Sequence, residues 1–463
     1  MDPIDSRFDE YDWILMYKSC FPLLNGRFAA VPRNLPMSAT IIARQDNAVT
    51  IQVHIPLTRS LLDTEEAIQQ ALNQAGCLAT AEALQQFDTD GSPLVFGPTR
   101  WTSKGQEPKA YQTPYGEVSV ARHLDQTGEG GATFCPLERD ARMILTATPR
   151  FAKQLSSKYG AGPAARVVKD LAGNHGRPVS LALVQDTAAA VAAVVQAKEE
   201  QWHYATPKLT EPIATISVGL DGTCLLLTED GHRQAMVASL SLYDREGERQ
   251  HTIYVAATPQ YGKDTFYQRL SREIEHVQQL YPTAHLTGVA DGSEDNWTFL
   301  RRYTQAECVD FDHATAYLYW VAKAVQPRDL SARAAWLDDR CHRLKHEPGY
   351  AVQLLSEIEN VVTAGLSETV QEEWQKAWTY FQNHHQQMRY AERVLAQWPI
   401  GSGVTEAACK TIVKVRLCRG GAKWKAEGAA AVLSLRTLIY TEGRWEQFWA
   451  KIDRYGFPVA IAV

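Results

Sequence analysis

The order of strand-like and helix-like segments between residues 213 and 313 constrains the fold more than any other feature of this sequence. Residues 215–222 read T-I-S-V-G-L-D-G and alternate apolar residues with small or polar ones, which is the period of a half-buried strand. Further strand-like and amphipathic runs follow, separated by turn residues. The expected elements are strands at 215–222, 234–244 and 250–258, a helix at 264–281, a strand at 285–290, a helix at 296–303 and a strand at 307–311.

Three strands that can form an antiparallel meander, followed by strands connected through helices, are typical of a ribonuclease H-like core. In that arrangement the first strand is central and the fourth lies beside it. Asp221 closes the first strand and Asp291 the fourth, so we expect the two carboxylates to be neighbours. A carboxylate on a strand is rigidly held, which suits metal binding, although Asp-Gly at a strand end is more often a turn.

A long helical stretch then replaces the strands and exceeds any simple connection within such a core. We interpret residues 316–398 as an α-helical insertion between two parts of the catalytic core, 206–315 and 399–463. After the insertion, Ser402 is expected to cap a helix whose first turn carries Glu406, where the helix dipole favours the ionised carboxylate. The predicted fold class is therefore mixed α/β.

Two further regions precede the core. Residues 1–145 are interpreted as an α+β accessory region that is irregular over 1–36 and then contains a β-hairpin, a helix beginning at Asp63, and mixed strand and loop. Residues 146–205 contain three short helices with a Gly-rich turn before the last, a pattern compatible with a helix-turn-helix or with a helical linker. The cations near that turn favour DNA binding; they are Arg166, Lys169 and Arg177.

Composition excludes several classes of protein. The chain of 463 residues has a formal net charge of −6, so any DNA contact must come from a local basic patch. The acidic N-terminal stretch does not resemble a signal peptide, and the longest apolar run, at 188–195, is too short to cross a bilayer. The eight cysteines form no C-x-x-C pair, which argues against a zinc ribbon and favours a reducing, cytoplasmic location.

Three carboxylates carry the predicted chemistry. Asp221, Asp291 and Glu406 supply the hard oxygen ligands that two Mg²⁺ ions prefer, with Mn²⁺ as a possible substitute. Two such ions stabilise both the attacking and the leaving oxygen of a phosphoryl displacement. Asp310 and His313 follow the second acid, and His313 is a candidate to contact the scissile phosphate or brace a metal ligand. The alternative is that both residues only cap and pack the next helix.

A run of cations follows Glu406 without any intervening acid. At helical spacing Lys410 and Lys414 share a face with Glu406. A solvated helix face normally mixes charges, so this run predicts phosphate contacts beside the third acid. Trp424 is a candidate to stack on an unpaired base, or else a core residue. The predicted DNA-binding cations are Lys410, Lys414, Arg416, Arg419, Lys423 and Lys425.

Blocks of ordered polar and glycine residues, spread from about residue 87 to 449, resemble the ISKra family of insertion-sequence transposases. The C-terminal blocks are YFQNHHQQMRY (380–390), IGSGVTEAACK (400–410) and GAKWKAEGAAAVLSLR (421–436). The central blocks are DGT (221–223), YDREGERQHTIYVAA (243–257), ADGSEDNW (290–297) and DFDHATAYL (310–318). The upstream blocks are FDTDGSP (87–93), YQTPYGEVSVARH (111–123), FCPLE (134–138) and TPRFAKQ (148–154).

The resemblance implies a DDE transposase with Asp221, Asp291 and Glu406 as its three acids. Asp310 and His313 resemble the D-x-x-H signature of Mutator-like transposases, in which the histidine lies near the scissile strand. Two positions depart from the family pattern, since Asp312 stands where an aromatic residue is expected and Ala316 where a glutamate is expected.

The implied partners are double-stranded DNA, as terminal inverted repeats and as target, and a second copy of the chain on that DNA. No membrane partner is expected, and the protein would be cytoplasmic and nucleoid-associated. Two other functions stay open at this point. One is a ribonuclease H-like endonuclease that does not join strands, and the other is a catalytically silent DNA-binding relic.

Overall fold

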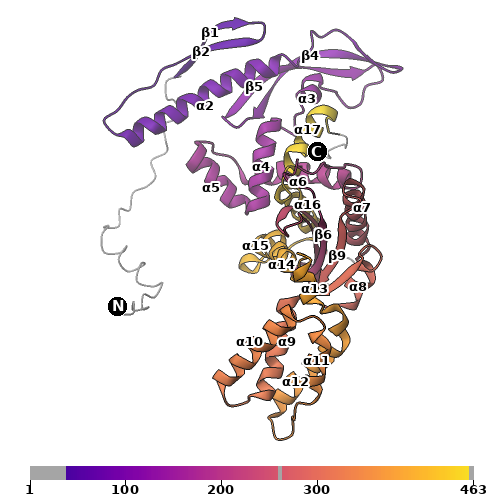
Figure 1. Cartoon of the computed structure of the whole chain (residues 1–463). Coiled ribbons are helices and arrows are strands. Elements are labelled where there is room, and N and C mark those ends of the chain that lie inside the picture. Colours follow the sequence, from indigo (N-terminus) through magenta and orange to yellow (C-terminus); the bar gives the residue numbers. More distant parts are fainter. Residues whose placement is uncertain (1–37, 259–262, 458–463) are drawn as a thin grey trace.

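The computed structural model describes residues 38–258 and 263–457, and it extends along one axis (Figure 1). A hairpin and a long helix from the N-terminal region lie at one end, a sheet lies in the middle, and the helices of the insertion lie at the other end. The irregular stretch expected at 1–36 is outside the described residues.

The central sheet has five strands in the order β10-β9-β6-β7-β8. β6 is antiparallel to β7, and β7 to β8, whereas β9 and β10 run parallel to β6. The expected adjacency of the first and fourth strands is confirmed. The elements are β6 (Thr215–Leu227), β7 (Gly231–Tyr243), β8 (Arg249–Ala257), α7 (Asp264–Leu280), β9 (His285–Ala290), α8 (Glu294–Leu300) and β10 (Ala306–Val309).

The register of the parallel strands brings three acids to one level of the sheet. Gly219 pairs with Val289, and Val309 pairs with Ala290. The next acid after these paired residues is Asp221 in β6, Asp291 after β9 and Asp310 after β10. Three adjacent strands therefore carry acids at one level of the sheet: Asp221 lies within β6, and Asp291 and Asp310 directly follow the carboxyl ends of β9 and β10.

Two predicted strand ends were wrong. β6 does not stop at Asp221 but continues to Leu227, because β7 pairs with it along its whole length and Asp221 faces Val237 across that pair. The Asp-Gly step is thus a strand position and not a turn. β10 ends at Val309, two residues early, because Asp310 caps the following helix.

Alternating side chains bury both faces of the sheet. Ile216, Val218 and Leu220 share one core with the apolar stripe of α7, which includes Phe266 and Leu270. The opposite face carries Val237 and Ala256, which pack against the C-terminal helices through residues such as Ile412 and Val432. Asp221 lies two residues after Gly219 in β6, so both residues point to the same face of the sheet. Thr405 packs against Gly219 on that face. The first acid therefore faces the helices that carry the third.

The insertion is helical, as expected. It follows β10 directly in the chain, and its helices lie together at one end of the molecule (Figure 1). Its helices share the core of the sheet through residues such as Leu318, Leu354 and Phe381. They are α9 (Phe311–Val325), α10 (Leu330–His346), α11 (Tyr350–Glu359), α12 (Glu368–His384), the 3₁₀ turn η2 (His385–Gln387) and α13 (Tyr390–Leu395).

The chain then returns to the sheet through a series of short helical pieces. One of them is a π-helical turn, a distortion that often occurs at functional sites. The pieces are α14 (Gly403–Ala408), the π-turn η3 (Cys409–Lys414), α15 (Val415–Leu417), the 3₁₀ turn η4 (Arg419–Gly421), α16 (Ala426–Tyr440) and α17 (Arg444–Tyr455).

The N-terminal region is α+β, as expected. Its helix α2 begins two residues before Asp63, because the side chain of Ser60 caps it by accepting from the Asp63 amide. The elements are β1 (Ala39–Gln45), β2 (Ala48–Val53), α2 (Leu61–Gln85), β3 (Leu94–Phe96), β4 (Thr99–Gln112), β5 (Glu117–Thr127) and α3 (Pro136–Asp140).

Three helices follow at the expected places, α4 (Pro149–Ala161), α5 (Ala164–His175) and α6 (Leu181–Glu199). By length and composition alone, α6 is the one helix among the described residues that is apolar enough to cross a membrane. It is also a core helix, because Val184, Val191 and Val194 are buried in a cluster shared with α4, α16 and α17.

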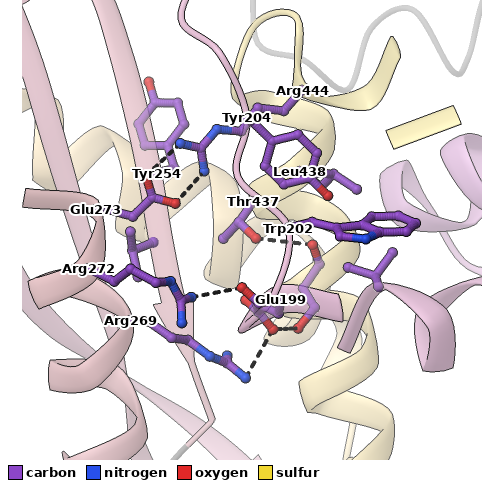
Figure 2. A pocket seen from close by; sticks show the side chains of 13 residues that line it. Glu199, Trp202, Tyr204, Tyr254, Arg269, Arg272, Glu273, Thr437, Leu438 and Arg444 are labelled. Atoms are coloured by element: carbon purple, nitrogen blue, oxygen red, sulfur yellow. Dashed lines mark hydrogen bonds and ion pairs between the residues drawn. The ribbon is translucent and has the colours of Figure 1, made fainter. Parts of the chain in front are cut away.

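A buried ionic cluster joins these helices to the core around a cavity of about 40 Å³ (Figure 2). At one side Glu199 of α6 lies 2.9 Å from Arg269 of α7 and accepts from Ser434 of α16. At the other side Arg444 makes a two-pronged ion pair with Glu273, at 2.8 and 2.7 Å. These pairs fix the helical segment, α7 and the C-terminal helices relative to one another.

Candidate active site

An open pocket of about 730 Å³ lies beside Asp221, in the middle of β6, and the carboxyl end of β9. Its walls come from the sheet, from α9, and from the helix that follows the insertion. The residues that line it are Asp221, Asp291, His313, Gly403, Glu406, Ala407, Cys409, Lys410, Lys414 and Val415. Three predicted acids, the predicted histidine and two predicted lysines therefore face one space.

Asp221 is held by two donors. Its Oδ1 accepts from the amide of Gly222 at 2.6 Å, and its Oδ2 accepts from the thiol of Cys409 at 3.5 Å. A side chain at Gly222 would overlap the exposed side chain of Gln234, which would have to move aside. Burial and the neighbouring Asp221 carboxylate raise the pKa of Cys409, which keeps the thiol protonated as a donor.

Asp291 follows β9 in a tight bend. Its Oδ1 accepts from the amide of Ser293 at 3.1 Å. Gly292 has φ +105, and an added Cβ there would lie only 3.1 Å from Nε2 of His384 in the insertion. The bend therefore requires glycine for its backbone conformation and for the close approach of His384.

Glu406 is positioned by the residues around it on α14. Thr405 lies over the glycine of β6 at position 219, and its hydroxyl bonds that of Ser239 on β7 at 2.7 Å. Ser402 begins the helix, as expected, but its side chain does not cap the backbone. The Ser402 hydroxyl instead donates to the Glu406 carboxylate at 3.1 Å, which aims the acid into the pocket.

Asp310 serves as the N-cap of α9, the structural role that was the alternative at this position. Its Oδ1 accepts from the amide of His313 at 2.7 Å, and its Oδ2 accepts from the amide of Ser402. Asp310 is fully buried, so these bonds tie the end of β10 to the start of α14.

Among residues 38–258 and 263–457, one group of side chains could hold a metal ion. It consists of Asp310, His313 and Glu406, whose ligand atoms lie within 4.8 Å of one another. This grouping differs from the predicted ligand set, because Asp221 and Asp291 line the same pocket but do not belong to it. His313 is 45% exposed, and its Nδ1 lies 3.6 Å from Oδ1 of Asp310. The histidine is therefore both braced by a carboxylate and open to the pocket.

The predicted cations divide into an exposed and a buried set. Lys410 and Lys414 line the pocket, and within residues 38–258 and 263–457 neither has an ion-pair partner. Arg419, Lys423 and Lys425 are exposed as well. These residues form a cationic border beside Glu406.

Arg416 and Trp424 do not belong to that border, which corrects the prediction. Arg416 is 8% exposed, bonds the carbonyl of Tyr159 at 3.2 Å, and lies between the rings of Tyr159 and Trp424. The indole of Trp424 donates to the carbonyl of Leu417 at 2.9 Å. Both side chains lock the C-terminal helices to the core, because the cation replaces its lost hydration with two aromatic faces and a carbonyl.

Arg177 is likewise not a free DNA contact. It is 5% exposed and donates to the carbonyls of Thr113 and Pro178. Arg166 and Lys169, in contrast, are exposed on α5. In a helix-turn-helix, the helix after the turn lies in the DNA groove, and here that helix would be α6. Near its start α6 exposes an acid, Asp186.

Several site residues escaped the sequence reasoning, namely Cys409, Ser402 as an orienting residue, and the insertion residues Tyr380 and His384. The last two belong to the block YFQNHHQQMRY, whose density of hydrogen-bonding side chains was a usable signal.

In comparisons with known proteins, no model of a protein family matches this chain, and no curated protein matches it either.

Proposed function

We propose that this chain is a DDE-type transposase with a ribonuclease H-like core, which cleaves DNA at the ends of an insertion sequence and joins the 3′-ends to target DNA. The observation that carries the proposal is the convergence of Asp221, Asp291 and Glu406 on one open pocket, together with Lys410 and Lys414. The order β10-β9-β6-β7-β8, with its single antiparallel meander, supports the core assignment. The sequence resemblance supports the reaction class.

The donor chemistry fits Mg²⁺, or Mn²⁺ in its place. The pocket offers carboxylate oxygens from Asp221, Asp291 and Glu406, and Asp310 and His313 lie beside Glu406. Oxygen ligands and an open, wet pocket suit hard divalent cations, which keep several waters. When bound, two such ions promote ionisation of the attacking hydroxyl group and stabilise the leaving 3′-oxygen.

The protein residues position the reactants. Lys410 and Lys414 hold the phosphates of the bound duplex, and His313 hydrogen-bonds the scissile phosphate. Ser402 and Cys409 keep Glu406 and Asp221 in fixed orientations. Because these supports come from packed helices and strands, Glu406 and Asp221 need little rearrangement during the reaction.

Two displacements at phosphorus account for the reaction. In the first, the oxygen of water bonds to the phosphorus at the element end, the P–O3′ bond breaks, and a proton reaches the 3′-oxygen. In the second, that 3′-hydroxyl oxygen bonds to a target phosphorus, the target P–O3′ bond breaks, and the displaced oxygen takes the proton. Terminal repeats and target DNA are the substrates, and a second copy of the chain would hold the second end.

The test uses labelled duplexes that carry the DNA flanking each side of the gene, a supercoiled target plasmid, and Mg²⁺ or Mn²⁺. The proposal predicts labelled strands covalently joined to the plasmid. Nicks without joined products would favour the endonuclease, and binding without either product would favour the silent relic. Asp221→Asn serves as the chemistry-deficient control.

A further inference from the structure

The C-terminal end of the insertion forms what we term the clasp, residues 380–390, which lies against the ends of β9 and β10. Tyr390 donates to the carbonyl of Val309 at 3.0 Å, and Gln387 donates to Glu307 at 2.7 Å. His384 occupies the space over Gly292, next to Asp291. The insertion therefore supports the turn that carries the second acid.

Tyr380 is the clasp residue whose role these contacts leave unexplained. Its ring stacks on Tyr317 of α9, with centroids 3.9 Å apart and planes 12° apart, and it lies 4.9 Å from the ring of His384. The residue is 8% exposed, so its ring is packed among its neighbours. Its hydroxyl is buried and finds no hydrogen-bond partner among the described residues, unlike the hydroxyl of Tyr390.

A buried hydroxyl without a partner is costly, so it is expected to gain one in some state of the protein. Burial raises the pKa of Tyr380, and the nearby ring of Tyr317 and the carboxylates of Asp310 and Asp291 raise it further. The hydroxyl therefore stays protonated as a donor, and its ring adjoins that of His384, which packs over Gly292 beside Asp291.

One of these acids has an oxygen that accepts no hydrogen bond from the described residues. Both oxygens of Asp310 already accept backbone amides. Asp291 uses Oδ1 for Ser293, and its Oδ2 accepts no hydrogen bond from residues 38–258 or 263–457. A rotation of the Asp291 carboxylate about its side-chain bonds is enough to change which donors it meets.

We propose that the Tyr380 hydroxyl donates to Asp291 when the acid turns to bind a divalent cation, so that Tyr380 is a positioning residue for the second acid. This inference rests on the proposed function of the same pocket. It gives the insertion a direct role in catalysis, since a helix from outside the core would complete the orientation of a core ligand. The same logic orients the ligands of many metal sites through an outer hydrogen bond.

The test compares Tyr380→Phe with Tyr390→Phe, a matched variant that loses a hydroxyl already satisfied by Val309. Each full-length protein is titrated with Mn²⁺ while its thermal unfolding is followed, and DNA cleavage is measured over the same range of Mn²⁺. Asp291→Asn and the double variant Asp291→Asn/Tyr380→Phe complete a cycle.

We expect Tyr380→Phe to unfold without metal at the wild-type temperature or above, because it removes an unsatisfied group. Its half-saturating Mn²⁺ concentration should rise about tenfold, the value of one hydrogen bond to a charged group. The Michaelis constant for DNA should not change, and Tyr380→Phe should have no further effect on Mn²⁺ binding in the Asp291→Asn background. Tyr390→Phe should lower thermal stability and leave the Mn²⁺ requirement unchanged.

Wild-type Mn²⁺ binding in Tyr380→Phe, or an equal loss in both tyrosine variants, would overturn the inference and leave the proposed function standing. Absence of any Mn²⁺ effect or cleavage in the wild-type protein, under conditions where it binds DNA, would overturn both. The two failures are therefore distinguishable.

Discussion

The thiol of Cys409 donates a hydrogen bond to the carboxylate of Asp221 across 3.5 Å, and it joins the π-turn after the third acid to the strand that carries the first. The two residues are far apart in the sequence, and neither strand periodicity nor charge pattern connects them. Their contact follows from the parity of β6, which turns Asp221 toward the C-terminal helices.

Alkylation should therefore discriminate among the cysteines. Burial and Asp221 raise the pKa of Cys409, so its reactive thiolate is scarce, whereas Cys224 and Cys418 are exposed. We expect iodoacetamide at pH 8 to modify Cys224 and Cys418 first and Cys409 only after unfolding, as read by peptide mass spectrometry. Because the folded state holds this proton more tightly, the contribution of Cys409 to stability is complete below about pH 9 and is lost as the pH rises further. Early modification of Cys409 in the folded protein would contradict the described packing.

Replacing the pocket acids with amides should abolish strand cleavage and preserve the fold. Asp221→Asn, Asp291→Asn and Glu406→Gln each remove a charged oxygen ligand, and we expect a loss of at least about 10²-fold in cleavage rate. Asp312→Asn is the matched control, because Asp312 is exposed near the site but does not line the pocket. Circular dichroism checks the fold, and a comparable loss in the control would point to a general charge effect.

Substitution of the exposed lysines should affect DNA binding, whereas substitution of the buried Arg416 should affect stability. Lys410→Ala and Lys414→Ala should each weaken DNA binding and lower the slope of log affinity against log salt by about one. Arg416→Ala should lower the melting temperature, because it empties the space between Tyr159 and Trp424. Fluorescence anisotropy at several salt concentrations and thermal unfolding separate the two effects. An unchanged salt slope in both lysine variants would remove these residues from the DNA interface.

The two partly buried glutamates of the ionic cluster should respond unequally to neutralisation (Figure 2). Burial raises the pKa of Glu199 despite Arg269, whereas at Glu273 the opposing pull of Arg444 outweighs burial and lowers the pKa. Glu273→Gln should therefore destabilise the protein by about 3–5 kcal/mol at pH 7, the cost of breaking a buried pair. Glu199→Gln, which resembles the protonated form, should cost much less.

The pH dependence of unfolding tests the opposite pKa shifts of Glu199 and Glu273. The lowered pKa of Glu273 means that its carboxylate stabilises the folded protein above about pH 4.5, and this stabilisation is lost as the pH falls. The raised pKa of Glu199 means that its protonation favours folding. Denaturant unfolding from about pH 5 down to about pH 3 should show a smaller pH dependence for Glu273→Gln than for the wild type. Equal destabilisation by both variants at pH 7 would argue against the assigned directions.

The sequence by itself determined the elements and their order. Period-2 and period-3.6 patterns are local, so the meander, the helix α7 and the helical insertion could be read from residues near one another in the chain. The adjacency of β6 and β9 followed from that order, and so did the expectation that Asp221 and Asp291 would be neighbours.

Only the tertiary structure decided the partners of each side chain. The length of β6, the capping role of Asp310 and the turning of Ser402 toward Glu406 depend on residues that are distant in sequence. Distant residues are also the reason why Arg177 and Arg416 are not DNA-binding candidates. In the sequence, an arginine in a basic run looks the same whether its side chain is solvated or stacked between aromatic rings. Hydrogen bonding and burial are set by three-dimensional neighbours, and the local pattern carries no record of them.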